Sequence, residues 1–226
     1  EFHYAFHVCH QGGDDINIIC DARLAVPFLN FLFENLQGMS LWESDTLTVP
    51  LYMCAGVAYV LKEKGFHSAY QLAAECCDSA KKAAKKEENL RDGLAGNWID
   101  FQICDTTNTQ ELDLQREKSY VTKEQIHMLM RPYCLDPEVK EEPVSYGRFL
   151  ERVRSLQQAK LTRQQQEALR LSYMMGRQEF RRWITHFRQN GLDLTALLGN
   201  AIHRDEDGQM YALWFDSVEM MDFIPE

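Results

Sequence analysis

Two adjacent glycines followed by two aspartates separate two short apolar stretches near the start of the chain. The first stretch, residues 4–9, and the second, residues 15–20, both carry apolar side chains at alternating positions. Consecutive glycines allow a tight turn with positive φ, a conformation that most side chains resist. The pattern therefore predicts a β-hairpin with Gly12 and Gly13 in its turn.

Asp14 and Asp15 stand at the tip of this predicted hairpin and are candidate metal ligands. Magnesium prefers hard oxygen ligands and commonly joins a few carboxylates to the phosphates of a substrate. A strand–Gly-Gly-Asp-Asp–strand hairpin is therefore suited to the core of a metal-dependent nucleotidyl-transfer palm. The same four residues also form ordinary surface turns, and the residues alone leave both interpretations open.

Composition and charge narrow the class of protein. The 226 residues are enough for one large or two small domains, and 45% of them are hydrophobic without a run long enough to cross a membrane. Seven cysteines at irregular spacings form no C-x-x-C pair, which indicates reduced thiols and a cytoplasmic protein. The net charge of −10 argues against a surface that coats nucleic acid, so any contact with RNA would use local basic patches.

The first half of the chain alternates between strand and helix patterns. After the hairpin, the patterns predict a helix, a buried strand, a second helix with Ser68 as its N-cap, and a half-buried strand, at residues 24–36, 49–61, 68–88 and 97–104. This order predicts an α+β fold with a mostly antiparallel sheet and helices on one side.

A change of composition predicts a second domain. Residues 105–117 are polar and lack a strong period, so they read as a linker. Helical patterns then run from Lys123 to Asn190, with breaks at prolines and at Gly176, and predict an all-α bundle. A small hairpin at residues 203–213 and a short helix at 216–223 follow. We place a first domain at 1–108, a linker at 109–122 and a helical domain at 123–226.

Two basic groups are candidate binding surfaces. Lys81, Lys82 and Lys85, with Lys86, project from the second helix opposite its apolar face, which is also how an ordinary solvated face is built. Arg163, Arg170 and Arg177 recur at seven-residue spacing, and Arg181 and Arg188 would continue this stripe if the helix runs through Gly176. That stripe is either a solvated face with i,i+4 ion pairs or a docking face for a partner.

Several motifs together carry a family resemblance. They are GGDD, AGVAYVLKEKGFHSAYQLAAECCDSAKKAAKKEENL, NWIDFQI, MRPYCLD, YGRFLERVRSLQQAKLTRQQQEALR and YALWFDSVEMMDFI, in this order along essentially the whole chain. In these motifs the chain resembles the second palm domain, and the helical domain after it, of the large subunit of type III CRISPR effector complexes. The palm is related in fold to GGDEF-type nucleotide cyclases, whose glutamate and phenylalanine are here Asp15 and Ile16.

The resemblance implies a fold, an activity and roles for residues. It implies a ferredoxin-like palm that makes cyclic oligoadenylates from ATP in antiviral defence, with Asp14 and Asp15 holding two Mg²⁺ or Mn²⁺ ions. Gly12 and Gly13 would let the nucleotide approach the backbone. Lysines at the end of the second helix would reach the triphosphate, with Lys81, Lys82, Lys85 and Asn89 as the candidates. The arginines Arg163, Arg170 and Arg177 would dock neighbouring protein subunits or the guide–target RNA.

One difference from the family pattern concerns completeness. In the family, a strand–helix–helix segment precedes the hairpin and supplies another metal-binding aspartate, whereas this chain begins almost at the hairpin. We therefore expect a partial palm whose upstream half comes from the same protein or from a split chain, and an isolated chain without activity. Two alternatives stay open: a catalytically silent palm that acts as a scaffold in a ribonucleoprotein, and a GGDEF-like regulatory domain that binds a nucleotide without converting it.

Overall fold

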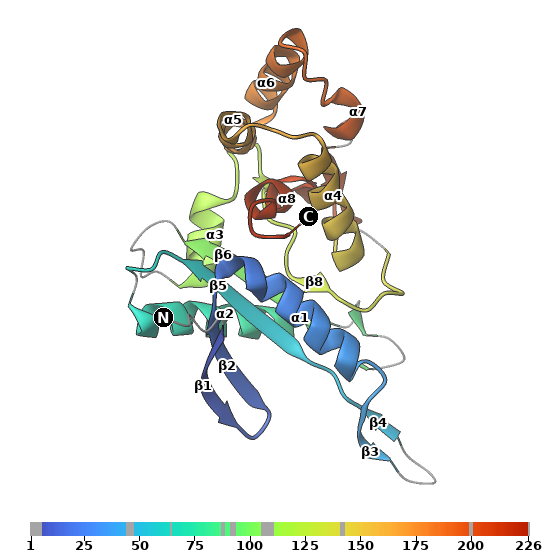
Figure 1. Cartoon of the computed structure of the whole chain (residues 1–226). Helices are drawn as coiled ribbons and strands as arrows, with labels where there is room; N and C mark the ends of the chain where they lie inside the picture. The colour runs from blue at the N-terminus through green and yellow to red at the C-terminus, as the bar shows by residue number, and fades with distance from the viewer. Residues whose placement is uncertain are drawn as a thin grey trace. The chain divides into compact units, whose positions relative to one another are not determined.

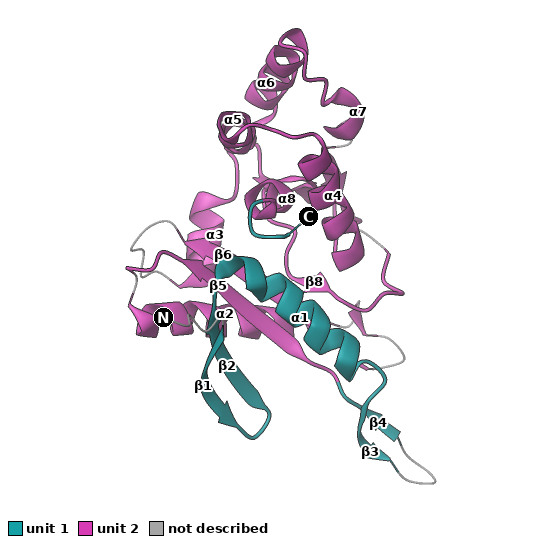
Figure 2. Cartoon of the chain, viewed as in Figure 1, with its two compact units in different colours: residues 1–51, 222–226 teal, residues 52–221 magenta. Residues whose placement is uncertain are grey.

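The structure, a computed structural model of the whole chain, describes most of its residues (Figure 1). The described residues are 6–43, 48–63, 65–86, 89–90, 94–104, 111–140, 143–198 and 201–225. They form two compact units, residues 1–51 with 222–226 and residues 52–221 (Figure 2). The division after Leu51 differs from the boundary that the sequence predicts at residue 108, which lies outside the described residues.

The first unit begins with the predicted hairpin. Strands β1 (Phe6–Gly12) and β2 (Asp15–Cys20) pair antiparallel, and Gly12 pairs with Asp15 next to the turn. Gly13 has a φ of +62°, the left-handed conformation that glycine adopts without strain. The described part of the predicted hairpin is thus confirmed, while Tyr4, at the start of its first strand, lies outside the described residues.

A helix and a second hairpin complete the first unit. Helix α1 (Ala22–Leu36) starts at Asp21, whose carboxylate accepts a hydrogen bond from the backbone N–H of Arg23 at 3.0 Å. Strands β3 (Ser40–Glu43) and β4 (Thr48–Pro50) then pair antiparallel. The single strand predicted over residues 49–61 is therefore wrong, since Pro50 has no N–H to continue a ladder and the next strand begins in the other unit.

The second unit has a three-stranded sheet with the order β5-β6-β8. Strands β5 (Cys54–Val60) and β6 (Trp98–Cys104) are parallel, and β8 (Tyr133–Cys134) is antiparallel to β6. Helix α2 (Phe66–Ala84) connects β5 to β6 and packs on both strands. We predicted a mostly antiparallel sheet, but the longer pairing in this sheet, β5 with β6, is parallel, because a helical crossover makes the strands that it joins parallel.

Strand β6 is more deeply buried than predicted. We expected a half-buried strand with Asp100 and Gln102 on a solvent face, but both side chains are fully buried. The aromatic residues beside them, Trp98 and Phe101, are also buried. Both faces of β6 are therefore covered, and its polar side chains need partners inside the protein.

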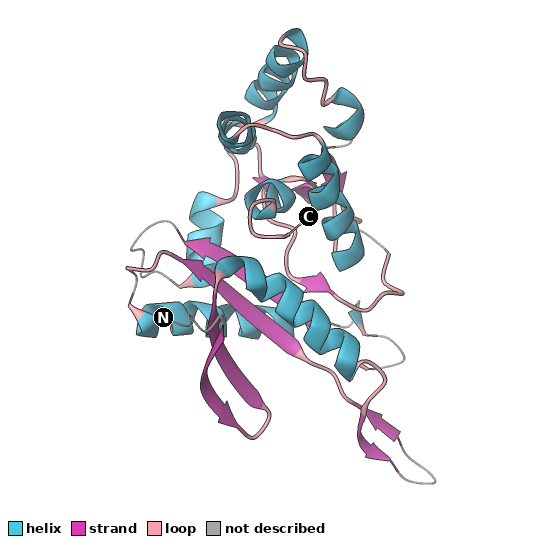
Figure 3. Ribbon diagram, viewed as in Figure 1, coloured by secondary structure: helices cyan, strands magenta, loops and turns pink. Residues whose placement is uncertain are grey.

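The rest of the second unit is mostly, but not only, helical (Figure 3). Its further helices are α3 (Leu112–Ser119), α4 (Tyr146–Gln158), α5 (Arg163–Met174), α6 (Arg177–Gln189), α7 (Thr195–Leu198) and α8 (Phe215–Met220). A small sheet with the order β7-β10-β9 joins β7 (Ile126–His127), β9 (Ile202–Arg204) and β10 (Met210–Ala212). Taken with the strands of the first unit, these elements confirm the α+β class.

Three expectations for this part have a clear outcome. The hairpin at residues 203–213 is confirmed, with Gly208 at a φ of +83° in its turn, and so is the short helix after it. The purely helical bundle is wrong, because the small sheet lies within it. Part of the predicted linker is helix α3, held by the buried Leu112 and by a hydrogen bond from its N–H to Glu75 at 2.8 Å.

Candidate functional site

The tip of the β1–β2 hairpin presents the two aspartates that the sequence singled out. Asp14 lies in the turn and Asp15 begins β2, and both are exposed. A Cβ atom on Gly12 would come within 2.8 Å of Nε2 of His10, so the imidazole ring lies beside the Gly12 backbone. His10 thus also lies at this tip, two residues before Gly12 on the same face of the strand.

The donors at the tip suit a hard divalent cation. Two exposed carboxylates are ligands that Mg²⁺ or Mn²⁺ accepts, and Mg²⁺ is commonly held by one or two carboxylates together with substrate phosphates. Among the described residues, no group of three or more His, Cys, Asp or Glu side chains is arranged to hold a metal ion. Asp14 and Asp15 would therefore provide part of a coordination shell, which phosphate and water oxygens complete.

The lysines of α2 lie in the second unit, at the end of the helix. Lys81, Lys82 and Lys85 are exposed, and Lys82 contacts Asp113 through Nζ at 3.7 Å. Asn89 donates from its side-chain amide to the carbonyl oxygen of Ala83 at 2.8 Å. The structure thus places the lysines on a solvent face as predicted, and it gives Asn89 a role in closing the end of the helix.

The three arginines do not share one helix. Gly176, at a φ of +98°, ends the helical run, so that Arg163 and Arg170 belong to α5 and Arg177 belongs to α6. Arg170 forms an ion pair with Glu167 at 2.9 Å, and a guanidinium nitrogen of Arg177 lies 3.4 Å from Sδ of Met210. The break predicted at Gly176 is thus confirmed, and the condition for a stripe that continues through this glycine is not met, because its conformation is one that a helix cannot contain.

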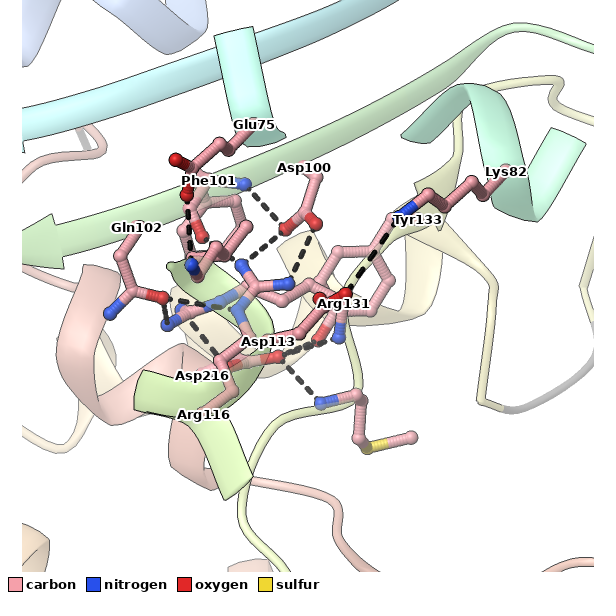
Figure 4. A network of polar contacts seen from close by, with 12 residues as sticks. Glu75, Lys82, Asp100, Phe101, Gln102, Asp113, Arg116, Arg131, Tyr133 and Asp216 are labelled. Carbon is pink, nitrogen blue, oxygen red and sulfur yellow. Dashed lines mark hydrogen bonds and ion pairs between the residues drawn. The ribbon is translucent and has the colours of Figure 1, made fainter. Parts of the chain in front are cut away.

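A buried ionic network is the main polar feature that sequence reasoning missed (Figure 4). Its first part joins β6 to α3: Arg116 donates to both carboxylate oxygens of Asp100 at 2.8 Å and through Nε to Gln102 at 3.2 Å. A bidentate pair of this kind is among the stronger polar contacts in proteins. Asp100 and Gln102 are thereby satisfied inside the protein, as buried polar groups require.

The second part of the network joins β6 to α8 through Arg131. Its guanidinium group is fully buried and contacts Asp216 at 3.2 Å, Glu219 at 3.3 Å and Gln102 at 3.3 Å. Asp216 also accepts hydrogen bonds from the Tyr133 hydroxyl at 2.7 Å and from the backbone N–H groups of Met130 and Arg131 at 2.9 and 3.1 Å. Segments more than eighty residues apart in the chain are thus joined by one carboxylate.

Burial and neighbouring charges shift the protonation of this network. Burial raises the pKa of Glu219 to about 7, with Arg131 opposing the shift and Asp216 adding to it. The pKa of Tyr133 is raised well above its ordinary value by burial and by Asp216. Burial disfavours the charged form of Arg131, but Asp216 and Glu219 more than offset this and raise its pKa. The guanidinium carbon of Arg131 also lies 4.4 Å from the ring centre of Phe101.

Comparison with known proteins assigns the chain to no family. No model of a known protein family matches the chain, and no curated protein matches it in sequence. Within the described residues, no helix is both long enough and apolar enough to cross a membrane. The candidate sites therefore rest on the residues and on their arrangement.

Proposed function

We propose that this chain contributes the palm of a cyclic oligoadenylate synthase in a cytoplasmic type III CRISPR effector complex, with ATP as substrate. The observation that carries the proposal is the β1–β2 hairpin with Gly-Gly-Asp-Asp at its tip and both carboxylates exposed. The family resemblance of the sequence supports the same assignment. A ferredoxin-like arrangement of the complete palm is part of the proposal.

Each part of the tip has a task in this proposal. Asp14 and Asp15 hold Mg²⁺ or Mn²⁺, and ions bound there supply positive charge to the triphosphate and acidify an attacking ribose hydroxyl. Gly12 and Gly13 carry no side chains, so a nucleotide can approach their backbone closely. Alignment and charge stabilisation carry most of the catalysis of such a transfer, and the protein needs no nucleophile of its own.

Other residues assist in binding rather than in chemistry. Lys81, Lys82 and Lys85 are exposed cations at the end of α2 that can attract a triphosphate, while Asn89 holds the helix end that carries them. A further palm strand with another carboxylate completes the site from the same protein or from a partner chain. The open edges of the hairpin support this part, because among the described strands β1 and β2 pair only with each other.

The helical part docks the palm to its complex in this proposal. Arg163 and Arg177 are exposed and Arg170 is partly exposed, and arginine pairs well with RNA phosphates and with carboxylates of other subunits. Such docking would let target RNA control synthesis. If the tip binds no nucleotide, the same surfaces describe a palm that acts as a scaffold in a ribonucleoprotein.

The aspartate pair provides the direct test. Replacing both residues, Asp14→Asn with Asp15→Asn, should weaken binding of ATP with Mn²⁺ at least about tenfold, because the metal loses its carboxylate ligands. Stability should stay within about 0.5 kcal/mol or rise, since two adjacent like charges are removed from an exposed turn. Isothermal titration calorimetry and thermal melting measure the two quantities.

A matched control lies on another exposed acidic turn, which belongs to the β9–β10 hairpin. Glu206→Gln with Asp207→Asn removes two exposed carboxylates from the β9–β10 hairpin and should leave nucleotide affinity unchanged. Equal affinity for ATP and Mn²⁺ in the Asp14/Asp15 variant and in this control would contradict the proposal.

A further inference from the structure

The second unit contains a hollow of about 300 Å³ beside the buried network. Its inner residues, Leu129 and Arg131, are buried, its aromatic residues are partly exposed, and Asp113 and Glu117 are exposed. The hollow therefore has a closed inner end and an acidic outer rim. Its volume reaches the lower end of the range for small-molecule sites.

One face of α3 forms a wall of the hollow. Asp113, Arg116 and Glu117 are spaced by three and four residues and so lie on one side of the helix, and Tyr120 continues this face just after its end. The small sheet forms the other wall. His127 of β7 and Tyr211 of β10 are paired in register, with their ring centres 5.6 Å apart. Aromatic rings thus stand on both sides of the hollow.

The charge that a ligand would meet in the hollow is negative. Arg116 is already paired with Asp100, and Arg131 with Asp216 and Glu219. Asp113 is paired only loosely with Lys82, at 3.7 Å with both side chains more than 70% exposed. No ion pair of Glu117 occurs among the residues that the structure describes. A phosphate would meet these rim carboxylates, whereas a cation would be attracted by them.

We propose that this hollow binds an organic cation through its guanidinium or ammonium group. Asp113 and Glu117 attract the charged group, and the aromatic side chains of Tyr120 and Tyr211 line the hollow beside them, where a cation can contact a ring. The cation is either a basic side chain of a partner peptide or a free polyamine, which share this chemistry. No residue of the β1–β2 hairpin lines this hollow.

Two probes distinguish the sources of the cation. N-acetyl-argininamide stands for a peptide side chain and spermidine for a free polyamine, and binding of either is followed by NMR titration of the intact chain. We expect at least one of them to bind, with signals of Tyr211 and Glu117 shifting, and AMP to leave these signals unmoved. No binding of either cation at 10 mM, roughly the weakest affinity that such a contact would give, would overturn the proposal, and so would displacement of the cation by AMP.

Variants locate the binding in the hollow. Glu117→Lys reverses a rim charge on an exposed position and should weaken cation binding about tenfold, and Tyr211→Ala should weaken it several-fold by removing a ring face. Glu138→Lys and Tyr70→Ala change the same residue types at exposed positions elsewhere in this unit and should leave affinity unchanged. Thermal melting confirms that Glu117→Lys remains folded. Equal affinity of Glu117→Lys and Glu138→Lys would show that the cation does not bind here.

Discussion

Gly56 is the residue at which strand β5 and helix α2 come closest. A Cβ atom at this position would overlap the carbonyl oxygen of Ala73 and the backbone nitrogen of Cys77. These atoms belong to the helix backbone and cannot turn aside as a flexible side chain can. The absence of a side chain at Gly56 thus sets the distance between strand and helix, which is a common reason for glycine inside a strand.

We expect Gly56→Ala to lower the free energy of unfolding by roughly 1–3 kcal/mol, because the helix must move off the strand. Gly147→Ala is the matched control. A Cβ there meets only the Ser145 hydroxyl at 3.8 Å, and alanine in helix α4 should leave stability unchanged or raise it by up to about 1 kcal/mol. Chemical denaturation measures both variants, and equal stability of the two would show that β5 and α2 are not in close contact.

At the residue scale, the exposure of residues in the hairpin turn could be predicted from the sequence, whereas the burial of polar residues in β6 could not. Asp14 and Asp15 are exposed as expected, since a glycine turn at the tip of a hairpin has few neighbours to bury it. Asp100 and Gln102 were assigned to a solvent face because they alternate with apolar residues. Their partners Arg116 and Arg131 come from distant segments, and no local pattern in the sequence shows that pairing.

At the scale of elements, helix α8 is attached to the sheet by charges that depend on pH. Glu219 is almost fully buried, and its pKa is raised to about 7 from an ordinary 4.5, mainly by burial. Between these two pH values, the Glu219 carboxyl group therefore keeps its proton in the folded protein, whereas in the unfolded chain the same group is ionised. Its contribution to stability is present below pH 4.5 and is lost as the pH rises through 7.

The variant Glu219→Gln should remove this dependence. Between pH 4.5 and 8, the stability of the wild type relative to the variant should fall by roughly 2–3 kcal/mol as the buried carboxyl ionises. Urea denaturation across this pH range measures the difference, with the exposed Glu138→Gln as control. Parallel pH profiles of wild type and Glu219→Gln would contradict the assignment of Glu219 as a buried proton-binding group.

Elements with a clear period were predictable, and their pairing was not. Helix α1, the β1–β2 hairpin and strand β6 follow from local spacing of apolar residues and from turn residues. The parallel pairing of β5 with β6 depends on how α2, which connects them in the chain, packs on both strands, and this is a long-range property. Helix α3 lacks a strong apolar period and is fixed by tertiary contacts, so its sequence read as a linker.

At the scale of the whole molecule, the chain divides after Leu51 rather than at the change of composition near residue 108. The predicted boundary followed polarity, whereas the compact units follow packing, and polar α3 packs against α2 within the second unit. The hairpin carrying Asp14 and Asp15 belongs to one unit and the lysines of α2 to the other. The central claim is that a nucleotide and its metal bind at the hairpin. It can therefore be tested in the intact chain by observing the residues of the hairpin.

The most direct measurement is paramagnetic broadening of backbone amide signals by Mn²⁺. In the ¹⁵N-labelled chain with ATP present, substoichiometric Mn²⁺ should broaden the signals of Gly12, Gly13, Asp14 and Asp15 selectively, and Asp14→Asn with Asp15→Asn should abolish this effect. The signal of Gly208, in the acidic turn of the β9–β10 hairpin, should persist. Broadening that is equal at both turns, or that survives the double substitution, would contradict a nucleotide–metal site at the hairpin tip.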